Sequence, residues 1–471
     1  MSKFNLFKKN FVVYGLGGVI SKIVPLIMVP LVTRIMPNSE YFGISDLANT
    51  LLSLCTSLGI MGMYDAMCRM FFEKEDEEYK KEICSTAFFF TCIASVILFV
   101  VMILFGHLIA KLFFGDKELI NVVYIVAIAT LIGATNSIMS APTRMQNKGM
   151  VFVVMNAIGP IISYSISIPL LLCGHYVIAL PVAGLITAIV NETVFYGLNR
   201  NWFHFRLFKK EHIGPLIKIG LPLLPNFLIY WLFNSSDRLM ITSILGIGAA
   251  GLYSVGSKLG YTSQIIYTAF SGGSQYFAYA TMKEANQVRS NTLVFEYLGI
   301  ISFAVTSFVC CFSRYIYMFL FEQEYYESYI IAPYLFFAPL LQMLFQIAAN
   351  QFLVIKKTWP NALILLLGAL GNVVLNLVLI PVLGIEGAAI ATLIGYVLSD
   401  VICVIVLQKM KLMKVSAKFV FATILMIVFF VLWRIIFIEH LIAGLGMAIV
   451  FCAVLVVLYL NDIKLLFFKK K

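Results

Sequence analysis

The sequence predicts an all-α polytopic membrane protein. Of its 471 residues, 61% are hydrophobic and 12% are charged, and the mean hydropathy is +0.95, whereas soluble domains carry about 25% charged residues. The chain also runs apolar for about 20 residues at a time, the length of a helix that crosses a bilayer. A transmembrane barrel would instead alternate polar and apolar residues. The lysines and arginines gather between the apolar runs, as they do in loops that connect membrane helices.

About fourteen spans follow from the apolar runs. Two closely spaced pairs, 150–173 with 177–199 and 361–383 with 386–408, are each long enough for two crossings joined by a short turn. No cleavable signal peptide is expected, because the first run is too long for a signal and no small-residue cleavage site follows closely. The predicted spans are residues 11–35, 41–68, 83–106, 118–140, 150–173, 177–199, 213–241, 247–274, 292–319, 329–353, 361–383, 386–408, 419–438 and 441–461.

The distribution of positive charge predicts the orientation. Of the 34 lysines and arginines, 25 fall in the two tails and alternate loops, five fall on the other side, and four lie within spans. Because cytoplasmic loops carry the excess of positive charge, both termini are predicted to be cytoplasmic. Charge placed in this way does not indicate nucleic-acid binding, despite the net charge of +11. The nine cysteines and five histidines show no metal-ligand spacing, so neither a metal nor a cofactor is expected.

The two halves of the chain resemble each other at a shift of about 208 residues. At this shift Gly43 falls on Gly251, Glu192 on Asp400, and Lys148 on Lys356. The repeat predicts an N-terminal six-helix bundle over 1–208, a second six-helix bundle over 209–415, and two extra helices with a basic tail over 416–471. Six crossings return the chain to the side of the membrane on which it began, so both bundles would have the same orientation. They would be related by a pseudo-two-fold axis along the membrane normal.

Three cations lie within predicted spans one, seven and eight: Lys22, Arg238 and Lys258. A charge inside the bilayer costs about 2.5–3.5 kcal/mol on insertion scales unless it faces water or a partner. A cavity that these side chains line would attract an anion such as a phosphate or diphosphate, since arginine and lysine both bind such groups. They are therefore candidate substrate-binding residues. The alternative is that each pairs with a nearby acid and only holds helices together.

Four acids within the spans are candidates for ion or proton coupling: Asp46, Glu192, Asp237 and Asp400. Burial favours the protonated form of a carboxyl group, so such a group can carry a proton during transport. The alternative is hydrogen bonding between helices. Glu296, near the inner end of its span, is expected to reach the headgroup region.

A family resemblance rests on the segment from Asn10 to Leu47 and on two short motifs. The segment contains several prolines and the turn Arg34-Ile35-Met36-Pro37, and the motifs are Tyr41-Phe42-Gly43 and Gly251-Leu252-Tyr253. With two six-span halves and two extra spans, the chain resembles the oligosaccharide flippases of bacterial polysaccharide export. These belong to the superfamily of multidrug and toxic-compound exporters and the lipid II flippase.

The resemblance implies a transporter, not an enzyme, in the bacterial inner membrane. It would flip an undecaprenyl diphosphate-linked oligosaccharide to the outer leaflet by alternating access, for cell-surface polysaccharide synthesis, with a polymerase and glycosyltransferases as partners. The diphosphate and sugars would lie in a cationic cavity that includes Lys22, Arg238 and Lys258. A multidrug exporter is the first alternative, although twelve spans and acidic sites would suit it better. A membrane glycosyltransferase or ligase would need a longer outer loop, and a channel suits a two-fold repeat less well.

Overall fold

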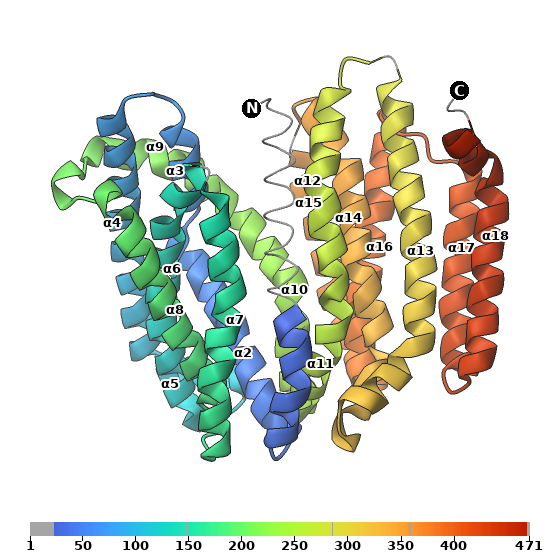
Figure 1. Cartoon of the computed structure of the whole chain (residues 1–471), viewed down its shortest axis with the longest axis horizontal. Helices are drawn as coiled ribbons and strands as arrows, with labels where there is room; N and C mark the ends of the chain where they lie inside the picture. Colours follow the sequence, from blue (N-terminus) through green and yellow to red (C-terminus); the bar gives the residue numbers. More distant parts are fainter. Residues whose placement is uncertain (1–22, 147, 285, 358, 469–471) are drawn as a thin grey trace. The chain divides into compact units, whose positions relative to one another are not determined.

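The computed structural model describes residues 23–468 except 147, 285 and 358 (Figure 1). Lys22 lies outside these residues. The described chain is helical throughout and contains no strand, which confirms the all-α prediction. Among the described residues, eleven helices are long and apolar enough to cross a membrane, or twelve when the bent pair α2 (Ser39–Ile60) and α3 (Met63–Phe71) counts as one span. Of the two other predicted spans, 247–274 falls on α11 (Ile247–Gly260) and α12 (Gln264–Ala280), and the described part of 11–35 forms the shorter helix Ile23–Ile35. The chain is thus a multi-pass membrane protein.

The described helices form two compact units, 1–254 and 255–471. In the first unit α6 packs against α2, α4 and α8, and α7 packs against α8 (Figure 1). The helix α9 lies against α3 and α4, and α10 lies against α2 and α5. The bounds not yet given are α4 (Glu77–Leu104), α5 (Gly106–Phe114), α6 (Ile120–Met145), α7 (Gly149–Leu172), α8 (Ala179–Asn199), α9 (Lys210–Gly220) and α10 (Leu224–Leu245).

Several predicted spans are broken helices. The span predicted over 41–68 bends by 45° between α2 and α3, because Met61 and Gly62 both adopt left-handed backbone conformations, with φ of 49° and 72°. A residue with positive φ cannot continue an α-helix. A methyl group at Gly62 would also overlap the carbonyl oxygen of Gly220. The close contact between the start of α3 and the end of α9 therefore holds the bend in position.

The helices α2 and α11 cross at two glycines. A Cβ atom on Gly43 would lie 2.5 Å from the carbonyl oxygen of Ile247, and one on Gly251 would overlap the carbonyl oxygen of Ser39. Ser39 and Ile247 are 208 residues apart, as are Gly43 and Gly251. Each helix therefore presents equivalent positions to the other, as in the self-complementary contact of a two-fold dimer. The 208-residue repeat itself stays a prediction.

In the second unit α14 is buried among α12, α13 and α16, and α15 pairs with α16 through a turn at Gly384, whose φ is 61°. The last two helices, α17 and α18, form a hairpin that packs against α13. We call them the C-terminal hairpin. The bounds are α12 (Gln264–Ala280), α13 (Gln287–Leu320), α14 (Ala332–Val354), α15 (Trp359–Leu383), α16 (Ile385–Lys409), α17 (Ala417–Leu432) and α18 (Leu441–Phe468).

Two buried glutamates fasten the C-terminal hairpin. Glu296 of α13 accepts hydrogen bonds from the backbone N–H of Ser416, at 2.6 Å, and from its hydroxyl, at 2.8 Å, and a third from Tyr459 at 3.2 Å. Glu386 of α16 accepts two from Arg434, at 2.6 and 2.9 Å. The expectation that Glu296 reaches the headgroups is wrong, because its side chain is enclosed by these donors and is only 3% exposed.

Candidate functional site

A buried ion-pair cluster lies in the first unit, where α2, α10 and α11 meet. The Nε of Arg238 donates to Oδ2 of Asp46 at 2.5 Å, and the hydroxyl of Ser254 donates to the same oxygen at 2.6 Å. Arg238 and Asp46 are both less than a tenth exposed. An ion pair buried in this way is favourable only when further hydrogen bonds satisfy the remaining donors and acceptors of both groups.

Asp237 completes the cluster. Its side chain is fully buried and accepts hydrogen bonds from the hydroxyl of Tyr253 and, at 2.9 Å, from the backbone N–H of Arg238. Nη1 of Arg238 lies 3.5 Å from Oδ1 of Asp237 and donates to the carbonyl oxygen of Asn234 at 2.6 Å. Two carboxyl groups thus share one guanidinium group. With both acids ionised the three side chains carry a net negative charge, which a proton or a monovalent cation would neutralise.

The cluster forms one layer across three helices. Asp46 is seven residues from the first residue of α2, Arg238 seven from the last residue of α10, and Ser254 seven from the first residue of α11. At a rise of about 1.5 Å per residue, each lies about 10 Å from its helix end. The sequence proposed Arg238 as a substrate-binding cation and Asp46 and Asp237 as coupling acids, and the structure brings these three together.

The other predicted site residues lie elsewhere. Glu192 on α8 is half-buried and accepts a hydrogen bond from Thr135 of α6 at 3.1 Å. Lys258 is half-buried on α11, in the second unit. Asp400 on α16 is also in the second unit, and Lys22 lies outside the described residues. For Arg238 the arrangement is the alternative that the sequence left open, in which an intramembrane cation pairs with nearby acids.

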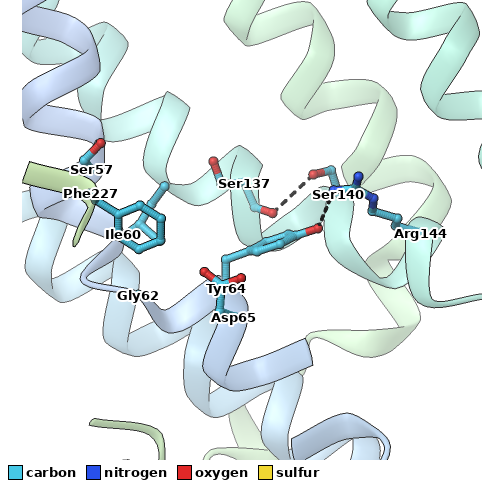
Figure 2. Close-up of a pocket in the computed structure, with 9 residues that line it drawn as sticks. All are labelled: Ser57, Ile60, Gly62, Tyr64, Asp65, Ser137, Ser140, Arg144 and Phe227. Atoms are coloured by element: carbon cyan, nitrogen blue, oxygen red, sulfur yellow. Dashed lines mark hydrogen bonds between the residues drawn. The ribbon is translucent and has the colours of Figure 1, made fainter. Parts of the chain in front are cut away.

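A polar pocket of about 290 Å³ opens elsewhere in the first unit (Figure 2). The phenol of Tyr64 points across it and accepts a hydrogen bond from Nη1 of Arg144 at 3.0 Å. Arg144 lies in the last turn of α6, where a cation is favoured by the helix dipole. The wall combines an acid, a cation, hydroxyl groups and aromatic faces, from Ser57, Ile60, Gly62, Tyr64, Asp65, Ser137, Ser140, Arg144 and Phe227.

One group of side chains has the composition of a metal site. Ligand atoms of Glu82, Glu211 and His212 lie within 4.8 Å of one another, between α4 and α9. The carboxylate of Glu82 already has two partners, Nε2 of His212 at 3.1 Å and Nζ of Lys209 at 3.5 Å. A lysine ammonium is a competing cation in that position. The group is therefore best described as a polar contact that joins α4 to α9.

Sequence reasoning did not propose Tyr253, Ser254, Tyr64 or Arg144 as site residues, although Tyr253 belongs to one of the two motifs that carry the family resemblance. Arg144 was counted only as a charge of an inner loop. A signal for Ser254 was present, because it lies 208 residues after Asp46, the same shift that relates Gly43 to Gly251. No local signal identified Tyr64, whose role depends on the break between α2 and α3.

The fold is that of polytopic membrane transporters. Over 96% of this chain and all of the other, it matches the lipid II flippase MurJ in an inward closed conformation, with a TM-score of 0.74 and 14% identity. It also matches an inward-facing MATE family multidrug transporter of the MOP superfamily, over 85% and 94% of the two chains (TM-score 0.62, 16% identity). A Vibrio cholerae MATE transporter matches over 86% and 97% (TM-score 0.63, 13% identity).

The sequence places the chain in a particular family. The profile of the polysaccharide biosynthesis protein family matches residues 31–328, which is more than half of the chain, and the protein belongs to that family. The match confirms the family to which the sequence motifs pointed. None of the curated proteins matches the sequence significantly.

Proposed function

We propose that this protein flips an undecaprenyl diphosphate-linked oligosaccharide from the inner to the outer leaflet for the synthesis of a cell-surface polysaccharide. One observation carries the proposal: a polysaccharide biosynthesis family member superposes on the lipid II flippase MurJ over 96% of its length. The MATE transporters named above leave a larger part of this chain unmatched, with coverage of 85% and 86%. Flipping is a movement without covalent chemistry, so the protein acts as a transporter and not as an enzyme.

The charged end of such a substrate requires cations within the membrane. We assign the diphosphate to Lys22 and Lys258, with Arg238 as a third ligand in a conformation that opens its cluster. Arg238 is bonded to Asp46, Asp237 and Asn234 in the present structure. A diphosphate that binds this guanidinium must displace a carboxylate group from it. Arg238 would then exchange one anionic partner for another. Substrate binding and rearrangement of the cluster would thereby be coupled.

The acids of the same cluster suit a coupling role. Asp46 and Asp237 face one guanidinium group, so release of Arg238 leaves two carboxyl groups that a proton or a cation must neutralise. Glu192, which Thr135 contacts, and Asp400 are further coupling candidates in the two units. A cation that enters when the diphosphate takes Arg238 would drive the conformational cycle.

The polar pocket of Figure 2 suits the sugar part of the substrate. Sugar hydroxyls both donate and accept hydrogen bonds, so they match a wall that offers an acid, a guanidinium and serine hydroxyls together. The rings of Tyr64 and Phe227 offer apolar surface to the faces of a sugar. A diphosphate would suit this pocket less well, because Asp65 on the same wall repels it.

The competing function is export of organic cations, which the likeness to MATE transporters favours. Reconstitution in liposomes separates the two functions. A fluorescent lipid-linked oligosaccharide and a cationic dye are followed separately, with a chemical quencher that reads the outer leaflet. We expect glycolipid movement without dye transport; dye transport without glycolipid movement would establish the exporter instead.

Substitutions test the site. Lys22→Ala and Lys258→Ala should each weaken binding of the glycolipid, while Lys357→Ala, in a loop on the predicted inner side, should leave binding unchanged. Unaltered binding in both lysine variants would remove the assignment of the diphosphate.

Cysteine labelling from each side of an intact inner membrane tests the proposed orientation, in which both termini are cytoplasmic. Co-purification tests for the polymerase and glycosyltransferase partners.

A further inference from the structure

The connection between α8 and α9 lies beside the first turns of α4 and carries both aromatic and positively charged side chains (Figure 1). It contains two short helical turns, η2 (Arg200–Trp202) and η3 (Phe205–Leu207). Its aromatic residues are Trp202, Phe203, Phe205 and Phe208. We call residues 200–210 the basic–aromatic segment. It shares no residue with the ion-pair cluster or with the polar pocket.

Hydrogen bonds from α4 hold the backbone of this segment in place. The hydroxyl of Ser85 donates to the carbonyl oxygen of Trp202 at 3.3 Å and accepts from the backbone N–H of His204 at 3.0 Å. The hydroxyl of Thr86 accepts from the backbone N–H of Lys209 at 3.1 Å. Because these bonds satisfy backbone groups along its length, the segment lies against α4 and has a fixed position relative to the predicted span 83–106.

The ring of Phe205 reaches the level of the apolar membrane core. It packs against the ring of Phe89, with the two centroids 5.3 Å apart, and Phe89 lies six residues after the start of the predicted span 83–106. At a rise of about 1.5 Å per residue, this is about 9 Å into the apolar run. Phe205 is nevertheless 77% exposed. At this depth the exposed ring meets acyl chains, as aromatic side chains do in segments that lie within a membrane interface.

The positive charges of the segment exceed the acids that could neutralise them. Lys209 has a partner, because its Nζ lies 3.5 Å from a carboxylate oxygen of Glu82. Glu211 is the one acid between positions 200 and 212. Three other cations are exposed and form no ion pair with an acid among the described residues: Arg200, Arg206 and Lys210. An anion beside the segment would therefore meet an excess of positive charge.

We propose that the basic–aromatic segment binds an anionic phospholipid of the cytoplasmic leaflet, with Phe205 among the acyl chains. Arg200, Arg206 and Lys210 surround the phosphate group, since anionic headgroups attract basic residues beside membrane helices and a guanidinium group binds a phosphate through two parallel hydrogen bonds. The positive-inside distribution predicts the connection on the cytoplasmic side. An acidic protein would satisfy the three cations but would leave Phe205, at the level of the acyl chains, without a role.

Native mass spectrometry of the full-length protein in detergent tests the proposal, because it counts the lipid molecules that stay bound. The protein is titrated with phosphatidylglycerol and, separately, with phosphatidylcholine of the same acyl chains. The wild type should bind its first phosphatidylglycerol at least about tenfold more tightly than phosphatidylcholine. The triple variant Arg200→Gln, Arg206→Gln and Lys210→Gln should lose this preference, with phosphatidylcholine binding changed by less than about twofold.

The connection between α16 and α17 provides the matched control, on the same predicted side of the membrane. The triple variant Lys409→Gln, Lys411→Gln and Lys414→Gln also removes three exposed cations, but residues 410–416 include no aromatic residue. This control should retain the full preference for phosphatidylglycerol. Equal loss of the preference in both triple variants would show attraction to diffuse charge and would overturn the proposal. Survival of the preference in the variant of the basic–aromatic segment would overturn it too.

Two further measurements distinguish a phospholipid from other anions. Phe205→Ser should weaken binding of both lipids by at least about threefold, because the ring contacts acyl chains whatever the headgroup. Glycerophosphoglycerol, the soluble headgroup without acyl chains, should not displace the bound lipid at about a hundredfold excess. Displacement by this headgroup, or unchanged binding in Phe205→Ser, would reduce the segment to a site for free anions and overturn the proposal.

A wild type without a tightly bound phosphatidylglycerol would leave the cations to an acidic protein and would also overturn the proposal. None of these outcomes depends on glycolipid flipping.

Discussion

The crossing of α2 and α11 gives a sharp prediction for Gly251→Ala. A methyl group on Gly251 would overlap the carbonyl oxygen of Ser39 and lie 2.8 Å from its carbonyl carbon and 3.2 Å from the nitrogen of Gly43. All three are backbone atoms, so the helices must separate. Overpacking of this kind costs about 1–3 kcal/mol. Separation also weakens the 2.6 Å hydrogen bond from Ser254 to Asp46, which adds about 1 kcal/mol.

Alanine has a compensating effect, because it favours a helix over glycine by about 1 kcal/mol. The net loss for Gly251→Ala is therefore about 1–3 kcal/mol of stability. Gly248→Ala is the control on the same helix: its methyl group would meet only side-chain atoms, Cγ of Glu40 at 3.4 Å and Oγ of Ser39 at 3.5 Å. It should keep the full gain in helix propensity.

Heat denaturation in detergent, followed by fluorescence-detected size exclusion, measures the difference. The midpoint should fall for Gly251→Ala and stay level or rise for Gly248→Ala. Gly43→Ala, whose methyl group would lie 2.5 Å from the carbonyl oxygen of Ile247, should behave like Gly251→Ala. A midpoint for Gly251→Ala that equals or exceeds that of Gly248→Ala would refute the argument that backbone contact at the crossing is required.

Three further changes have defined outcomes. Arg434→Gln removes two hydrogen bonds to buried Glu386. Because the arginine side chain is 42% exposed, the loss of stability should be about 1–2 kcal/mol. It should be seen as faster hydrogen exchange in α17. Asn199→Ala removes two buried hydrogen bonds to α6 and should cost about 1–3 kcal/mol in denaturation assays. Thr193→Ala, at an exposed position of the same helix, should have little effect. Tyr325 lies between α13 and α14, and burial raises the pKa of its phenol. Stability is therefore complete below the unfolded pKa of about 10 and falls above it, and Tyr325→Phe should reduce that alkaline loss of the denaturation midpoint.

Hydropathy was sufficient to predict the helices, because crossing a bilayer imposes both a length and an apolar composition. It did not predict the breaks within them. Gly62 adopts a positive φ readily, but Met61 has one too, and nothing in an apolar run marks a non-glycine residue for that conformation. The break depends on close contact between Gly62 and Gly220, which are far apart in the sequence.

The candidate site shows a second limit of sequence reasoning. The shift of 208 residues relates Gly43 to Gly251 and, equally, Asp46 to Ser254. A repeat identifies equivalent positions, but it does not say whether equivalent positions touch. The structure shows that these positions do touch, as positions beside the predicted axis would. The sequence therefore located the charges of the cluster within predicted spans and left open whether Arg238 lined a cavity or paired with an acid.

The buried glutamates make the C-terminal hairpin an integral part of the second unit. Glu296 and Glu386 are 3% and 6% exposed, and the donors of their hydrogen bonds include Ser416, Tyr459 and Arg434 from the hairpin segment. Deletion of residues 416–471 would leave both acids without these donors in an apolar environment, which costs about 1–2 kcal/mol for the half-exposed Arg434–Glu386 pair and about 1–3 kcal/mol for Glu296, whose buried carboxyl group loses its neutral donors.

The deletion should therefore abolish stable insertion, as measured by protease resistance in membranes. The same deletion combined with Glu296→Leu and Glu386→Leu should recover part of that resistance, because the uncompensated charges are gone. Recovery by the leucines would show that charge satisfaction, and not only apolar contact, binds the hairpin to the unit. If the plain deletion were as protease-resistant as the full chain, the hairpin would be an independent appendage, and the bonds to Glu296 and Glu386 would contribute little.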